Sequence, residues 1–137
     1  MTITLVLPLP PSTNRLWVPV RTAGGAKMVK RKAYADWSAM AQREVAQQRA
    51  GASFDAPFHA AILLPDDGPW DLDNLVKPLL DACQAGGAIK NDKLCRRLWV
   101  DCDDTRIGTA LIELSPLPPI GRAPGWTKGS ARMETTS

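Results

Sequence analysis

Residues 71–82 read Asp-Leu-Asp-Asn-Leu-Val-Lys-Pro-Leu-Leu-Asp-Ala, which places a group of charged side chains directly before an apolar, helix-like stretch. In an extended segment, Asp71 and Asp73 would point to the same side of the backbone, because side chains alternate along a strand. Lys77 lies one helical turn beyond Asp73 if a helix starts there. Asp92 follows across a helix-sized segment and supplies a third carboxylate. Oxygen ligands of this kind suit Mg²⁺, with Mn²⁺ as the alternative, so the pattern predicts a divalent metal beside an amine.

The helix that carries Lys77 is expected to begin at Asn74, because asparagine is a good N-cap. This start puts Pro78 in the first helical turn, where its missing amide proton costs least. Gly86 and Gly87 are expected to end the helix. One side of the helix is apolar and is predicted to be buried, and it consists of Leu75, Leu79, Leu80 and Cys83.

Apolar and alternating segments elsewhere in the chain predict four strands, over residues 2–9, 57–64, 96–102 and 105–114. A second helix is predicted over residues 32–49, and Gly51 ends it. Its apolar stripe consists of Tyr34, Trp37, Met40, Ala41 and Val45.

These elements predict an α/β fold of the α+β type, with a mixed sheet of about four strands and two main helices. The chain has 137 residues, of which 45% are hydrophobic, so one small domain over residues 1–114 is expected. Residues 12–31 are expected to form a long polar loop, and residues 115–137 a disordered basic tail. No apolar run approaches the roughly 20 residues that a membrane helix needs, which favours a cytoplasmic protein.

The charges are sorted along the chain although the net charge is only +3. The first 35 residues hold six bases and no acid, whereas residues 36–117 hold eight bases and thirteen acids. A basic segment beside an acidic one fits a nuclease, in which cations bind the phosphate backbone and carboxylates hold a metal. The basic segment taken alone fits a solvated loop without a ligand equally well. Trp70, next to the acidic pair, could stack on a base or instead pack against protein. The candidate phosphate contacts are Arg15, Arg21, Lys27, Lys30, Arg31 and Lys32.

Two other interpretations of the acidic residues fit the sequence less well. An EF-hand calcium loop opening at Asp71 fails, because apolar residues stand at positions 75, 76 and 82, where it requires an oxygen ligand, glycine and glutamate. As isolated features, Asp73 could cap a helix and Lys77 could form a surface ion pair with Asp81, but these roles leave Asp71 unexplained.

The remaining titratable groups favour structural roles. His59 lies in an apolar strand and is interpreted as a core or edge residue. An odd number of cysteines without metal-ligand spacing predicts free thiols, at Cys83, Cys95 and Cys102. A second acidic group could also bind metal but is interpreted as a turn between strands, and it consists of Asp101, Asp103 and Asp104.

The sequence resembles the RusA family of Holliday-junction resolvases, endodeoxyribonucleases common in phages and prophages. The resemblance rests on residues 71–82, on Gly86-Gly87, and on Ile89-Lys-Asn-Asp92. The opening Leu-Pro-Leu-Pro-Pro-Ser-Thr-Asn-Arg (residues 7–15) and the Tyr34-Ala-Asp-Trp segment are also similar to that family. The match spans roughly residues 3–114.

The resemblance implies that Asp71, Asp73 and Asp92 bind the metal and that Lys77 is the catalytic lysine. It also implies a homodimer that cleaves a four-way DNA junction by two symmetric nicks, in recombination and repair within a bacterial cell, encoded by a phage, a prophage or the host. Asn91 departs from the family, whose members often have a second aspartate there. Two alternatives share these residues: a nuclease for other branched DNA, and a non-catalytic DNA-binding protein with a degenerate site.

Overall fold

The computed structural model describes residues 1–11, 17–30, 32–66 and 72–117, with only the backbone described for residues 17–22 and 26–30. The elements follow the chain in the order β1 (Ile3–Pro8), β2 (Trp17–Thr22), β3 (Gly25–Lys30), α1 (Lys32–Gln48), β4 (Phe58–Pro65), α2 (Leu72–Ala85), the short 3₁₀ helix η2 (Asp92–Leu94), β5 (Cys95–Asp103) and β6 (Thr109–Pro116). The predicted α+β domain with a four-stranded mixed sheet and two main helices is confirmed.

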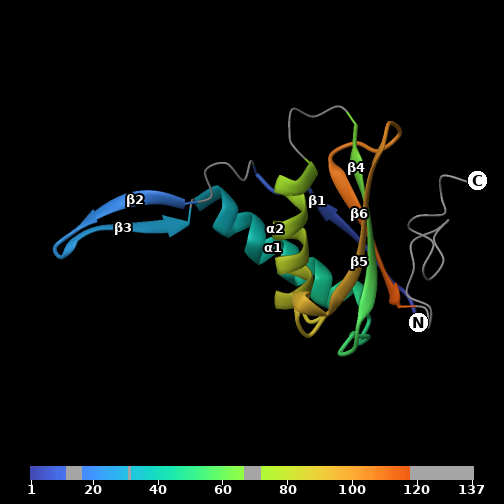
Figure 1. Cartoon of the computed structure of the whole chain (residues 1–137). Helices are drawn as coiled ribbons and strands as arrows, with labels where there is room; N and C mark the ends of the chain where they lie inside the picture. The colour runs from blue at the N-terminus through green and yellow to red at the C-terminus, as the bar shows by residue number, and fades with distance from the viewer. Residues whose placement is uncertain (12–16, 31, 67–71, 118–137) are drawn as a thin grey trace, which may run out of the picture.

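The four-stranded sheet has the order β1-β6-β4-β5. Strand β6 pairs antiparallel with β1 and β4, whereas β4 and β5 run parallel. Two parallel strands need a long crossover, and α2 with η2 supplies it. Both long helices lie on the same face of the sheet (Figure 1). The crossover therefore carries residues 72–94, with Asp73, Lys77 and Asp92, along the helix-covered face.

The core lies between the two helices and this face of the sheet. Strand β4 alternates, with Phe58, Ala60 and Ile62 buried and the residues between them partly exposed. The predicted apolar stripes of both helices are confirmed, with Met40 partly rather than fully buried. Full burial of one aliphatic side chain stabilises the fold by roughly 1.5–3 kcal/mol, so α2 is held mainly by its buried face.

The predicted start of α2 was wrong. The helix begins at Leu72, so Asp73 lies in its first turn rather than in an extended segment, and Pro78 lies inside the helix. Proline cannot donate the amide hydrogen bond to the carbonyl four residues earlier, at a cost of about 3 kcal/mol. Burial of Pro78 itself and of neighbours such as Leu75 and Leu79 offsets this cost.

The end of α2 follows from two glycines, as predicted. The Ala88 amide donates to the Cys83 carbonyl at 2.9 Å, and the Gly87 amide donates to the Gln84 carbonyl at 3.1 Å. Gly87 has a φ of 89°, a left-handed conformation that glycine adopts without a steric penalty. This pair of bonds is the Schellman motif, and it turns the chain back toward η2.

The predicted loop over residues 12–31 was wrong in its central part. Strands β2 and β3 pair antiparallel, from Trp17 opposite Lys30 to Thr22 opposite Gly25. This hairpin projects away from the body of the molecule (Figure 1). The turn between these short strands is Ala23-Gly24, and Gly25, with a φ of 121°, begins β3, so the glycines that suggested flexibility instead lie at a hairpin turn.

The two edges of the four-stranded sheet differ. On β1, the Gln48 side chain accepts from the Val6 amide at 2.7 Å and donates to the Val6 carbonyl at 2.9 Å. Trp37 also donates to the Pro8 carbonyl at 2.9 Å. Side chains of α1 thus occupy part of this edge, while β5 forms the other edge of the sheet.

Two further boundaries differ from the prediction. Strand β6 covers Thr109–Pro116 rather than residues 105–114, because a turn occupies the chain after Asp103. The predicted tail therefore begins inside β6, and residues 118–137 lie outside the described part. Among the described residues, no helix is long and apolar enough to cross a membrane.

Substitution of Gly86 by alanine should destabilise the domain at the contact between α1 and α2. An added Cβ at Gly86 would lie 2.5 Å from the Val45 Cβ and 2.8 Å from the Gln42 carbonyl oxygen. Overpacking of this kind typically costs about 1–3 kcal/mol. Urea unfolding of Gly86→Ala should show the loss, whereas Gly24→Ala, where a Cβ would have nothing within 4 Å, should change the unfolding free energy little. Equal stability of the two variants would contradict this packing.

Candidate active site

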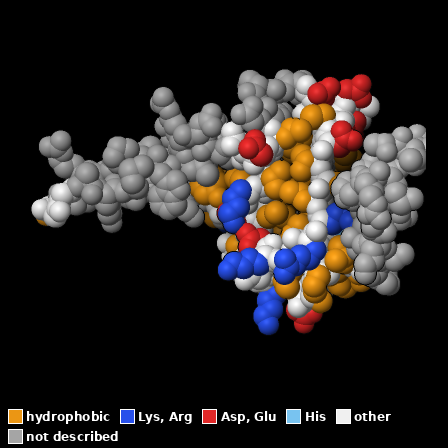
Figure 2. All heavy atoms as spheres, viewed as in Figure 1, with side chains coloured by type: hydrophobic (Ala, Val, Ile, Leu, Met, Phe, Trp, Pro, Cys, Tyr) orange, Lys and Arg blue, Asp and Glu red, His pale blue; other side chains and the backbone are white. Residues whose placement is uncertain are grey.

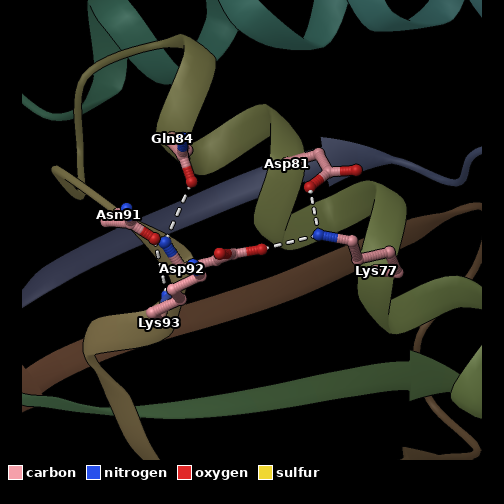
Figure 3. A network of polar contacts seen from close by, with 6 residues as sticks. All are labelled: Lys77, Asp81, Gln84, Asn91, Asp92 and Lys93. Carbon is pink, nitrogen blue, oxygen red and sulfur yellow. Dashed lines mark hydrogen bonds and ion pairs between the residues drawn. The ribbon is translucent and has the colours of Figure 1, made fainter.

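Lys77 joins two elements at the exposed side of α2. Its Nζ donates to Asp81 Oδ1 at 2.9 Å and to Asp92 Oδ2 at 2.6 Å (Figure 3). Asp81 lies one helical turn beyond Lys77, whereas Asp92 comes from η2, on the other side of the turn that ends α2. The lysine therefore connects the helix to the segment that follows it, and the predicted pairing of Lys77 with Asp81 is confirmed.

These contacts keep the amine charged. The hydrogen bond to Asp92 raises the pKa of Lys77 well above its usual range, and the hydrogen bond to Asp81 adds to this effect. The lysine side chain is 68% exposed and that of Asp92 is 23% exposed. Exposed ion pairs contribute only about 0–1 kcal/mol to folding. The ion pairs of Lys77 therefore add little to the stability of the fold. A role in binding or chemistry is a better explanation for this cluster of charges.

Asp92 is fixed by hydrogen bonds on both sides of its backbone. Its amide donates to Gln84 Oε1 at 2.9 Å, and Asn91 Oδ1 accepts from the Lys93 amide at 2.9 Å (Figure 3). Asn91 is thus the N-cap of η2. Neither support was predicted from the sequence. An asparagine directly before Asp-Lys-Leu could have suggested the cap, but Gln84 contacts Asp92 only through the fold.

Of the predicted site residues, the structure brings Asp92 into contact with Lys77. Asp73 lies in the first turn of α2, one turn before Lys77, and its side chain is exposed. Asp71 lies outside the described residues. In the part of the chain that is described, no three His, Cys, Asp or Glu side chains are grouped to hold a metal ion. The three-carboxylate site thus stays a prediction, although Asp73 and Asp92 are hard oxygen donors of the kind that suits Mg²⁺.

A mostly apolar groove of about 370 Å³ adjoins these charged groups. Its walls come from α2 and β5, and they consist of Leu72, Asp73, Val76, Lys77, Leu80, Leu98 and Val100. Figure 2 shows hydrophobic side chains gathered on this face, with basic and acidic side chains beside them. The site thus combines carboxylates and an ammonium with an apolar wall on one side.

The first turn of α1 lies near the same cluster. Burial raises the pKa of Tyr34, and the charge of Asp81 raises it further, while Lys77 acts in the opposite direction. Tyr34 follows closely on the basic hairpin. Helix α1 therefore connects the predicted phosphate-binding segment to the group around Lys77.

The structure describes some of the predicted DNA contacts with their side chains, some by backbone only, and some not at all. Lys32 is exposed and its Nζ pairs with Asp36 at 2.7 Å. The backbone positions of Arg21, Lys27 and Lys30 lie in the β2–β3 hairpin. Three predicted contacts lie outside the described residues, and they are Arg15, Arg31 and Trp70.

The second acidic group lies at the end of β5 rather than wholly in a turn: Asp101 and Asp103 belong to the strand, and Asp104 is in the turn that follows. Asp103 Oδ1 accepts from the Thr105 hydroxyl at 2.6 Å and from its amide at 3.0 Å. The hydrogen bond from the Thr105 hydroxyl lowers the pKa of Asp103 most, and the bond from the Thr105 amide lowers it further. The three cysteines are free, as predicted, and burial raises the pKa of Cys83 to about 12.

His59 is a partly exposed residue of β4 that packs on β5. Its ring contacts Trp99 edge to face, with centroids 5.4 Å apart. Partial burial, followed by the charge of Arg97, lowers the pKa of His59. Its neighbours Phe58 and Ala60 face the helices, so His59 lies on the opposite face from α2, apart from the carboxylate group.

The fold brings a charged amine and carboxylates together at one exposed site, and groups of this kind suit phosphodiester chemistry. The family model of the endodeoxyribonuclease RusA matches residues 8–113. A crossover junction endodeoxyribonuclease RusA from Aquifex aeolicus (strain VF5) is 37% identical over 90 residues, which cover 64% of this chain and 68% of the relative. The chain belongs to the RusA family of endodeoxyribonucleases.

Proposed function

We propose that this protein resolves Holliday junctions by metal-dependent hydrolysis of two symmetric phosphodiester bonds, during DNA recombination and repair in the cytoplasm of a bacterial cell. The observation that carries the proposal is the contact of Lys77 with Asp92, because it assembles residues from two elements in a member of an endodeoxyribonuclease family. The name of the Aquifex relative supports the four-way junction as the substrate.

The proposed ligands of a Mg²⁺ ion, or of Mn²⁺, are Asp71, Asp73 and Asp92. A divalent ion held there would make an attacking water more acidic and would neutralise charge on the phosphate. Asp92 suits this task because Gln84 and Asn91 hold its backbone segment before any ligand binds. Asp73 lies in the first turn of α2, one helical turn before Lys77, so the proposed ligands would come from both ends of the crossover.

Lys77 is the proposed electrostatic catalyst. Its ammonium would donate to a non-bridging oxygen of the scissile phosphate and stabilise the charge that develops in the transition state. The charge is preorganised, because Asp81 holds the amine one turn along the same helix. Loss of one such donor typically lowers the rate about 10²–10³-fold.

Cleavage of a labelled four-way junction tests this proposal. Wild-type protein with Mg²⁺ should make paired symmetric nicks, and a chelator should abolish them. Asp73→Asn and Lys77→Ala should each lower the cleavage rate at least about 100-fold, because they remove a metal ligand or a charge used in the transition state. Junction affinity, measured by electrophoretic mobility shift, should stay within a few-fold of wild type.

A matched control is Glu113→Gln, which removes a carboxylate on the sheet face opposite to α2 and should cleave like wild type. Cleavage retained in both Asp73→Asn and Lys77→Ala would refute the site. Tight junction binding without nicks by the wild type would indicate a binding protein with a degenerate site. If flaps and other branched DNA are cleaved as fast as the junction, the proposed hydrolysis would stand, but the four-way junction would not be the preferred substrate.

The proposed DNA-binding surface includes the β2–β3 hairpin and the start of α1. The hairpin projects from the body, so a duplex arm could contact it while the scissile phosphate lies at Lys77. Lys32 pairs with Asp36 at 2.7 Å, so a phosphate would compete with that carboxylate for its ammonium. The proposed group comprises Arg15, Arg21, Lys27, Lys30, Arg31 and Lys32, with Trp70 as a stacking residue.

Removal of hairpin charge should weaken junction binding and flatten its dependence on salt. For duplex DNA, each cation that no longer binds a phosphate reduces the slope of log K against log salt concentration by about 0.9. The triple variant Arg21→Gln, Lys27→Gln, Lys30→Gln should therefore lose up to about three units of slope in a fluorescence-anisotropy titration. Single-turnover cleavage at saturating protein should change little. An unchanged slope would place the DNA surface elsewhere.

A homodimer is the proposed assembly, because two symmetric nicks require two sites related by a twofold axis. Support comes from β5, an edge strand on which Leu98 and Trp99 are 43% and 42% exposed. An exposed apolar edge strand is a ready site for association. The twofold axis is therefore proposed to lie near β5, beside the groove and Lys77.

Charge placed on β5 should separate the dimer. Leu98→Lys should shift sedimentation from dimer toward monomer and reduce paired nicking, because a charged residue would be buried between the copies. Ile107→Lys is the control. Ile107 is 82% exposed in the loop before β6, so this variant should remain dimeric. Identical sedimentation of Leu98→Lys and wild type would move the dimer interface away from this edge.

A further inference from the structure

The amine of Lys77 and the proposed metal compete for one carboxylate. Lys77 Nζ lies 2.6 Å from Asp92 Oδ2, so a positive charge already contacts an oxygen that is proposed to bind the cation. Two cations around one carboxylate repel each other strongly at these distances. A divalent ion bound by Asp92 must therefore weaken the contact between Asp92 and Lys77.

The two partners of Lys77 differ in how they are attached to it. Asp81 is on the same helix, at the i, i+4 spacing that keeps two side chains adjacent. Asp92 belongs to η2, which follows the turn after α2, and Gln84 holds its backbone rather than its carboxylate. When the hydrogen bond to Asp92 breaks, the ammonium therefore stays bound to Asp81, and the flexible lysine stem allows it to turn about that contact.

We infer that Lys77 is a tethered counter-ion that occupies Asp92 until a divalent cation replaces it, and that Asp81 is the positioning residue that retains the displaced ammonium beside the phosphate. The inference rests on the proposed role of Asp92 as a metal ligand. Before the cation binds, the Lys77 amine is shared between Asp81 and Asp92. When the cation binds to Asp92, the amine is released toward the substrate.

Binding of Mn²⁺ to the intact chain without DNA tests the inference, with free Mn²⁺ followed by electron paramagnetic resonance. Removal of the competitor in Lys77→Met should tighten binding about two- to fivefold, the range that an exposed ion pair of this kind supplies. Lys93→Met is the matched control. It removes the same charge from the residue after Asp92, but the Lys93 hydrogen bond to Asn91 uses the backbone amide, so the change should be less than about twofold.

The role of Asp81 requires a double-mutant cycle. Asp81→Asn should weaken Mn²⁺ binding about two- to fivefold when Lys77 is present, because the ammonium then has only Asp92 as its carboxylate partner in this cluster. In the Lys77→Met background the same change should have little effect. A purely structural or through-space role of Asp81 would give the same effect in both backgrounds. Urea unfolding of each variant checks that the domain remains folded.

The outcomes separate the inference from the proposed function. Binding that is abolished in Asp92→Asn but unchanged in Lys77→Met would overturn the exchange and leave the metal site standing. Equal effects of Lys77→Met and Lys93→Met would also overturn it, because charge alone would then explain the tighter binding. Wild-type protein without saturable Mn²⁺ binding, or binding indifferent to Asp92→Asn, would overturn the metal role of Asp92 and the exchange with it.

Discussion

Burial of one face of α2 against the sheet is the interaction on which the rest of the structure depends. The parallel pairing of β4 with β5 forces a crossover, and the apolar side of α2, with Leu75, Leu79 and Cys83, fixes that crossover to one face. The opposite side of the helix is then left to solvent, where Lys77 and Asp81 lie. The same packing that stabilises the domain thus orients the charged groups.

The end of α2 determines how the site closes. The Schellman motif at Gly87 reverses the chain, and Asn91 and Gln84 hold the following turn so that Asp92 returns to Lys77. Asn91 caps η2 through its side-chain oxygen, a role that a carboxylate could also fill, but it places no second negative charge next to Asp92.

Local patterns predicted most of the fold. The alternation in β1 and β4 and the stripes of α1 and α2 indicated four strands, two helices and the buried side of each. The start of α2 was predicted too late. Proline is expected in the first turn of a helix because its missing hydrogen bond is costly further along, unless other interactions offset the loss. Burial of Pro78 and its neighbours compensates it here. The hairpin was missed because Gly24-Gly25 suggests flexibility as readily as a tight turn.

The sequence by itself determined the chemistry of this protein: which groups are acidic, basic or apolar, and at what spacing along the chain. Spacing also placed Lys77 beside Asp81, because an i, i+4 contact depends only on helix geometry. Tertiary structure decided which carboxylate from outside the helix meets the lysine. The Lys77 and Asp92 contact, and the support from Gln84, arise from packing and from the turn after α2, since residues far apart in sequence have no fixed distance until the chain folds.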